Sequence, residues 1–139
     1  MTCNDVQQQI VEEFNALENF EARFRYMVKL GRSLTPFPEE KKTPERTLVS
    51  CQTVIWHDVN FVDGKLEFEC YSDSMQMRGI IAMLMRIYSN RSPQEILDSP
   101  PNFVQQLDMD AFKSANHTTG LEDLLAQIQR YAEQYRQAA

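Results

Sequence analysis

The stretch that decides the fold is residues 53–71, TVIWHDVNFVDGKLEFECY. Its first part, Thr53–Asp58, is rich in β-branched and aromatic side chains, which are typical of strands. Asp63-Gly64 is a strong signal for a tight turn, and the residues after it alternate between charged and apolar. The apolar positions of that second strand are Leu66, Phe68 and Cys70. We therefore predict a β-hairpin with one face covered and the other in water.

Helical patterns lie on both sides of the hairpin. Directly after it, Ser72 or Asp73 can cap a helix over Ser74–Ser89 that is apolar almost all round, which indicates a central buried helix. Before it, apolar residues at helical spacing predict two helices, and Gly31 marks the end of the second. Between them and the hairpin, Ser33–Arg46 carries three prolines among charged residues, so we expect an exposed loop that leads to Cys51.

Three further helices are expected after the central one. Ser92-Pro93-Gln94-Glu95 is a capping box with proline at the first helical position, and a short helix is expected around Phe103–Leu107. The last helix begins near Thr118 or Thr119. The predicted fold class is therefore α+β, with a small antiparallel sheet packed against several helices.

Composition limits the possible functions. The chain has 139 residues, which suits one domain over 1–139, and a formal net charge of −6. An acidic chain is a poor binder of nucleic acid, and no apolar run is long enough to span a membrane. With no export signal at the start, we expect a cytoplasmic protein whose thiols are reduced.

The three cysteines and two histidines are the candidate reactive groups. Cys70 belongs to the apolar face of its strand, and Cys3 lies in a segment expected to fray. Cys51 follows the proline-bearing loop, where it can act as a nucleophile or pack as a small hydrophobic residue. A protease-like pair with His57 is implausible, because six extended residues separate the two by about 20 Å. His117 precedes the last helix and reads by itself as a solvated residue.

The sequence contains no motif that is typical of a metal site or a nucleotide-binding site. No Cys-x-x-Cys or His-x₃₋₅-His pair is present, so no metal site is expected from spacing. The two glycine-rich motifs that bind nucleotides, Gly-x-x-x-x-Gly-Lys and Gly-x-Gly-x-x-Gly, do not occur in the sequence. We therefore expect no cofactor and no metal bound by this chain.

The residues around Cys51 resemble a known family signature. The run from Val49 to Trp56 is similar to the Gly-Cys-Gln-Ser-x-Val-Trp motif of the SufE/CsdE family. Further segments match that family in the same order, and they are Phe20–Gly31, Ser72-Asp73, Arg78–Ala82, Ser92–Leu97 and Gly120-Leu121.

The resemblance implies a fold shared with IscU-type iron–sulfur scaffolds, and it implies a task. Cys51 would accept sulfur from a pyridoxal-phosphate cysteine desulfurase, stimulate that enzyme, and pass the sulfur to an iron–sulfur scaffold or another downstream acceptor. Ser50, Gln52, Asp73 and His117 would support the thiol or contact the partner. The pyridoxal phosphate would belong to the desulfurase.

Four positions depart from the family pattern. Ser50 replaces glycine, Thr53 replaces serine, Tyr71 replaces the first aspartate of Asp-Ser-Asp, and His117 replaces arginine. Because of the changes at 50 and 117, a binding module that regulates a desulfurase without carrying sulfur is a second hypothesis. An iron–sulfur scaffold is a third, although such proteins gather several cysteines at one place.

Overall fold

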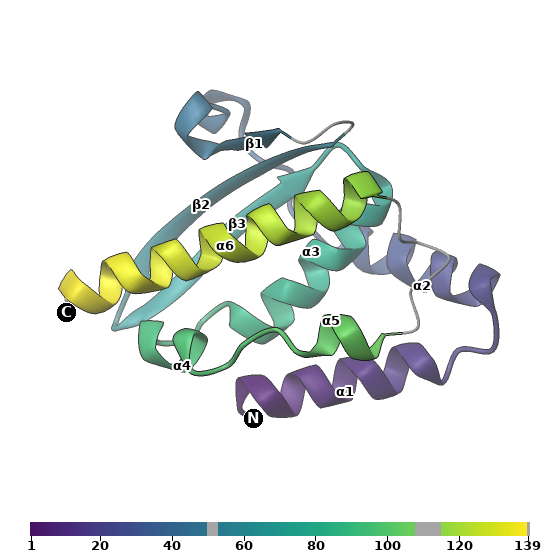
Figure 1. Cartoon of the computed structure of the whole chain (residues 1–139). Coiled ribbons are helices and arrows are strands. Elements are labelled where there is room, and N and C mark those ends of the chain that lie inside the picture. Colours follow the sequence, from purple (N-terminus) through teal and green to yellow (C-terminus); the bar gives the residue numbers. More distant parts are fainter. Residues whose placement is uncertain (50–52, 108–114, 139) are drawn as a thin grey trace.

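The computed structural model describes residues 1–49, 53–107 and 115–138. Figure 1 shows a small sheet with two helices, α3 and α6, on one of its faces, and α1 and α2 on the far side of α3. The α+β prediction is therefore confirmed. The elements are α1 (Cys3–Asn15), α2 (Phe20–Arg32), η1 (Glu39–Lys41), η2 (Pro44–Arg46), β1 (Thr47–Val49), β2 (Val54–Val62), β3 (Lys65–Ser72), α3 (Met75–Tyr88), α4 (Pro93–Leu97), α5 (Phe103–Gln106) and α6 (Ala115–Ala138).

The sheet has three antiparallel strands in the order β1-β2-β3. The predicted hairpin is confirmed, with Val62 paired to Lys65 and both turn residues, Asp63 and Gly64, at positive φ. Its first strand extends to Val62, beyond the expected end at Asp58. The strand Thr47–Val49 was not expected at all, and it forms because the free edge of β2 supplies hydrogen-bond partners.

The core lies between the sheet and the helices. The central helix α3 is buried over most of its surface, as its composition predicts, and it contributes the fully buried side chains of Met77, Ile81, Met83, Leu84 and Ile87. The helix begins one residue later than expected, because Ser74 is its N-cap and accepts from the Met77 N–H at 3.2 Å. The predicted capping box of Ser92 and Glu95 is present at the start of α4.

Helices α2 and α3 cross at unusually close range, and two glycines allow this. A Cβ on Gly79 would lie 2.6 Å from the Met27 carbonyl oxygen, and one on Gly31 would lie 2.8 Å from the Arg78 Cβ. The expectation that Gly31 ends its helix was wrong, because α2 continues to Arg32 and Gly31 is a packing residue inside it. A side chain at either glycine would push the two helices apart.

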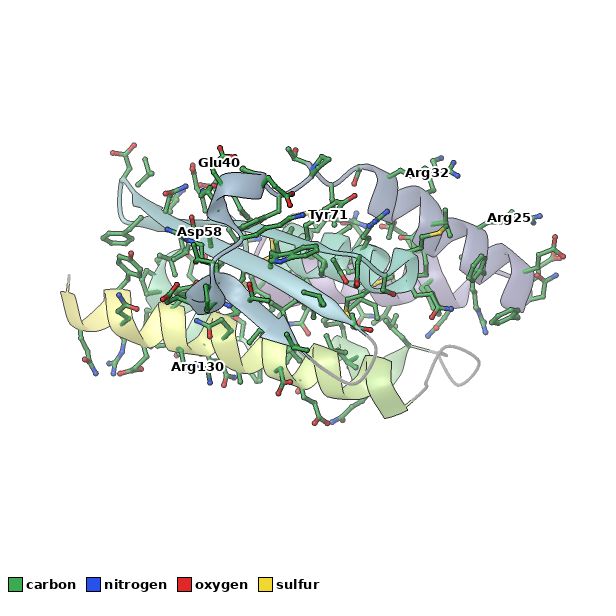
Figure 2. All side chains as sticks on the ribbon, turned by 90° about the horizontal axis from the view of Figure 1, so that it is seen from above. Arg25, Arg32, Glu40, Asp58, Tyr71 and Arg130 are labelled. Atoms are coloured by element: carbon green, nitrogen blue, oxygen red, sulfur yellow. The ribbon has the colours of Figure 1, made fainter. Side chains whose placement is uncertain are left out.

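The outer face of the sheet is not simply in water, which corrects a second expectation. Residues 33–46, called the strap below, lie across it (Figure 2), and Phe37 of the strap is only 5% exposed. Lys41 Nζ forms ion pairs with Asp58 at 2.8 Å and with Glu69 at 2.9 Å. Lys42 Nζ lies 4.0 Å from the centre of the Trp56 ring. Two lysines of the strap therefore hold it against the sheet, one through ion pairs with acidic residues and the other through a cation–π contact with an aromatic ring.

Candidate functional site

The predicted site residues Ser50, Cys51 and Gln52 lie outside the described residues, so their roles stay predictions. Their described neighbours are the last residue of β1 and the first residues of β2. Val49 pairs with Val54, which makes the two strands an antiparallel pair at this end of the sheet. The Val49 side chain is 72% exposed, whereas Thr53 is 2% exposed.

Asp73 lies at this same end and holds the beginning of β2. Its Oδ1 accepts from the Val54 N–H at 3.0 Å, and its own N–H donates to the Val54 carbonyl at 3.4 Å. Beside it, the Ser72 hydroxyl donates to that carbonyl at 2.8 Å. Neither residue caps α3, contrary to expectation, because Ser74 takes that position. Ser72 and Asp73, at the junction of β3 and α3, instead bind the first residue of β2, the strand that follows Cys51 in the sequence.

His117 lies in the first turn of α6, earlier in the helix than its expected start near Thr118. Its side chain is outside what the structure describes, so its proposed contact with the thiol or a partner is untested. Figure 1 shows that the beginning of α6 lies at the same end of the sheet as the beginning of β2. Two predicted site positions far apart in the sequence, Asp73 and residue 117, are therefore brought to one end of the molecule.

The two described cysteines are both buried. Cys70 is 6% exposed on the covered face of β3, as predicted, and burial raises the pKa of its thiol to about 12. Cys3 was expected in a frayed segment, but it is the first residue of α1 and is 2% exposed. Thr2 caps this helix in a capping box with Asp5, which explains why the start of the chain is ordered. Neither thiol is presented to solvent.

His57 is a residue of the core. It is 2% exposed, and its Nδ1 lies 2.6 Å from the hydroxyl of Tyr131 on α6. Burial lowers the pKa of His57, and burial likewise raises the pKa of Tyr131 to about 12. The two therefore form a neutral hydrogen-bonded pair that joins β2 to α6.

Arg78 belongs to this end of the molecule, and reasoning from the sequence did not single it out. Its Nε donates to the Ser72 carbonyl at 2.7 Å, and its guanidinium lies 4.7 Å from the centre of the Tyr71 ring. Tyr71 stands where the family pattern has aspartate, and here its ring stacks on the Arg78 guanidinium. Tyr71 and Arg78 are seven residues apart in the sequence, one in a strand and the other in a helix. Neither strand nor helix periodicity predicts a contact between residues in two different elements.

The chain matches a known family over most of its length. Residues 8–132 match the SufE family model, described as an Fe-S metabolism associated domain. The chain belongs to the SufE family. That family is associated with iron–sulfur metabolism, and the resemblance to it that the sequence motifs indicate is confirmed.

Relatives of known sequence cover most of the chain. An uncharacterized SufE-like protein of Rhizobium etli is 31% identical over 131 residues, which is 89% of this chain and 87% of that protein. A second uncharacterized SufE-like protein, from Rhizobium meliloti, is 29% identical over 131 residues, covering 90% and 93%.

A solved structure supports the fold. The solution structure of a hypothetical protein from Thermus thermophilus superposes with a TM-score of 0.72 and covers 93% of this chain and 94% of that one, at 21% identity. At this level of sequence identity, the similarity supports the fold and no statement about function. Among the described helices, none is both long and apolar enough to cross a membrane.

Proposed function

We propose that this SufE-family protein is a sulfur carrier. It takes persulfide sulfur from a pyridoxal-phosphate cysteine desulfurase onto Cys51, stimulates that enzyme, and passes the sulfur to an iron–sulfur scaffold or a related acceptor. The proposal treats residues 1–139 as one SufE-like domain, and it places the protein in the cytoplasm, where thiols stay reduced.

The distribution of the thiols carries the proposal. The chain has three cysteines, and the two that are described, Cys3 and Cys70, are buried in the core. A thiol whose pKa is about 12, as for Cys70, supplies almost no thiolate at neutral pH. Cys51 is the remaining candidate, and it stands in the SufE-like run Ser50-Cys51-Gln52.

The transfer is a thiol–persulfide exchange. The Cys51 thiolate attacks the outer sulfur of the desulfurase's cysteine persulfide, and a new S–S bond forms as the old one breaks. The electron pair of the broken bond leaves with the enzyme's cysteine, which is released as a thiolate. No oxidant or reductant is consumed, and the only cofactor involved is the partner's pyridoxal phosphate.

The described surroundings suit such a step. The link residues Ser72 and Asp73 fix Val54, three residues after Cys51, through bonds of 2.8 and 3.0 Å. Only Gln52 and Thr53 separate Cys51 from this fixed strand residue, and so close an attachment would limit the volume that the thiol searches when a partner binds. Asp73 acts in this proposal as a positioning residue, and Ser50, Gln52 and His117 as residues that support the thiol or contact the partner.

The test is sulfur loading followed by intact mass spectrometry. The protein is mixed with a bacterial cysteine desulfurase and free cysteine, and the mass of one added sulfur atom is expected on the wild type. The gain should disappear on treatment with dithiothreitol and in Cys51→Ser, and it should persist in Cys70→Ala. Equal loading of wild type and Cys51→Ser would contradict the proposal.

The same samples separate the two other hypotheses. If Cys51→Ser stimulates the desulfurase as well as the wild type does, the protein is a regulatory binding module. The scaffold hypothesis gains no support from the described residues, in which no three His, Cys, Asp or Glu side chains are grouped to hold a metal ion. Anaerobic reconstitution with iron and sulfide, followed by visible absorbance, tests it directly.

A further inference from the structure

A small crevice opens where the end of α2 meets the start of α3. It is lined by Val28, Gly31, Arg32, Met75 and Arg78, and its volume is about 90 Å³. Pockets for small molecules are commonly about 300–1,000 Å³, so this one has room for a single side chain. The close crossing of the two helices at their glycines shapes its floor.

Two arginines, Arg32 and Arg78, line this crevice. Arg78 is fixed through its Nε, which donates to the Ser72 carbonyl, and through its stack on Tyr71. These contacts orient the group, and among the described residues no hydrogen bond uses its two terminal nitrogens. Within residues 1–49, 53–107 and 115–138, neither Arg78 nor Arg32 forms an ion pair with a carboxylate. The crevice therefore concentrates positive charge that the described protein does not neutralise.

The surrounding helix strengthens this field. The whole chain has a net charge of −6, yet within α2 the cations Arg23, Arg25, Lys29 and Arg32 outnumber the acid Glu21. Arg25, Lys29 and Arg32 are exposed, and their spacing of four and three residues puts them on one side of the helix. Arg25 is paired with Glu21 at 2.9 Å, so Lys29 and Arg32 contribute most of the positive charge on that side. Figure 2 shows Arg25 and Arg32 along that side, away from α6.

One of the side chains that line the crevice is apolar and exposed. Met75, the first residue of α3, is 51% exposed, although most of this helix is buried. Met75 comes two residues after Asp73, whose carboxylate binds Val54 near the predicted thiol. The crevice and the beginning of β2, the strand that follows Cys51 in the sequence, are therefore parts of one side of the molecule.

We propose that this crevice is a socket for an acidic side chain of the desulfurase. An Asp or Glu of the partner would place its carboxylate between Arg32 and Arg78, with its methylene groups against Met75. Guanidinium groups bind carboxylates through paired N–H donors, and an apolar wall strengthens the interaction by excluding water. The proposal rests on the proposed function, and it assigns Arg32 and Arg78 as specificity-determining residues for the partner.

The experiment is a titration of the protein into the desulfurase at several salt concentrations. Arg32→Glu is the main variant, because Arg32 is exposed and its replacement leaves the core intact. Arg78→Gln is the second variant, with thermal unfolding as a check on folding. Arg136→Glu, at an exposed arginine near the far end of α6, makes the same charge change away from the socket.

We expect Arg32→Glu to raise Kd by about tenfold or more at low salt and to flatten its salt dependence, and Arg78→Gln to raise Kd by at least several fold. Arg136→Glu should leave Kd within about twofold of the wild-type value. If Arg32→Glu binds as tightly as Arg136→Glu while the wild type still loads sulfur, the socket is refuted and the sulfur-carrier function stands. If the wild type neither binds the desulfurase nor loads sulfur, both proposals are refuted.

Discussion

Replacing Asp58 with asparagine should release the strap from the sheet. The Asp58 carboxylate is 18% exposed and lies 2.8 Å from Lys41 Nζ and 3.6 Å from Arg46 Nε. Burial by itself raises the pKa of Asp58, but the hydrogen bond from Lys41 and the nearby cations outweigh it and hold that pKa below its ordinary value. The charged form is therefore the one that the fold prefers.

The size of the effect follows from burial and from the contacts that remain. A pair of unit charges about 4 Å apart near a protein surface gains about 4 kcal/mol before desolvation, and most of that is lost in removing the ions from water. Lys41 keeps Glu69 as a partner in the variant, which limits the loss further. We expect Asp58→Asn to lower the free energy of unfolding by about 1–2 kcal/mol. That corresponds to a urea midpoint about 0.5–1 M lower.

The assay uses the intrinsic fluorescence of the protein. Trp56 is the single tryptophan of the chain, and Lys42 of the strap lies on its ring. Release of the strap should therefore change the Trp56 emission of the folded variant, and urea unfolding followed at the same wavelength measures stability. The matched control is Glu133→Gln, which breaks the exposed pair with Arg136 and should leave the urea midpoint unchanged. If both variants unfold at the same urea concentration with unchanged emission, the strap is not held in this way.

Three other outcomes are expected. Asp73→Ala removes the acceptor for the first N–H of β2 and should alter the rate at which Cys51 reacts with a thiol reagent, whereas Asp73→Asn, which keeps an acceptor oxygen, should alter it less; equal rates in all three proteins would rule out a positioning role. Gly79→Ala places a Cβ 2.6 Å from the Met27 carbonyl oxygen and should destabilise the fold by about 1–3 kcal/mol despite alanine's better helix propensity, and a rise in melting temperature would show that the crossing tolerates a side chain. Because burial lowers the pKa of His57 in the folded state, the unfolded chain binds its proton first, so stability should fall as pH drops below about 6.5, by at most about 1.4 kcal/mol per pH unit. His57→Gln should flatten this slope in urea melts at stepped pH, and an unchanged slope would assign the effect to other groups.

The sequence by itself determined the parts of the fold that depend on neighbours in the chain. The turn at Asp63-Gly64, the alternation after it and the capping box of Ser92 and Glu95 are local, since each pattern is complete within a few residues. The burial of Cys70 could also be predicted from the alternation of its strand, and that of α3 from its almost entirely apolar composition. The motif around Cys51 led to the SufE family, which the comparison over residues 8–132 confirmed.

Only the tertiary structure decided the features that join distant segments. Thr47–Val49 is too short to show a strand pattern, and it becomes a strand because β2 offers an open edge. Gly31 has the position of a helix stop, yet close packing against Arg78 keeps it inside α2.

The same holds at the candidate site. Ser72 and Asp73 have the composition of helix caps, but their oxygens bind Val54, which lies eighteen and nineteen residues earlier in the chain. Arg32 and Arg78 meet at one crevice because α2 and α3 cross there. These contacts form only when folding brings residues from distant segments together, so the spacing of residues along the sequence cannot predict them.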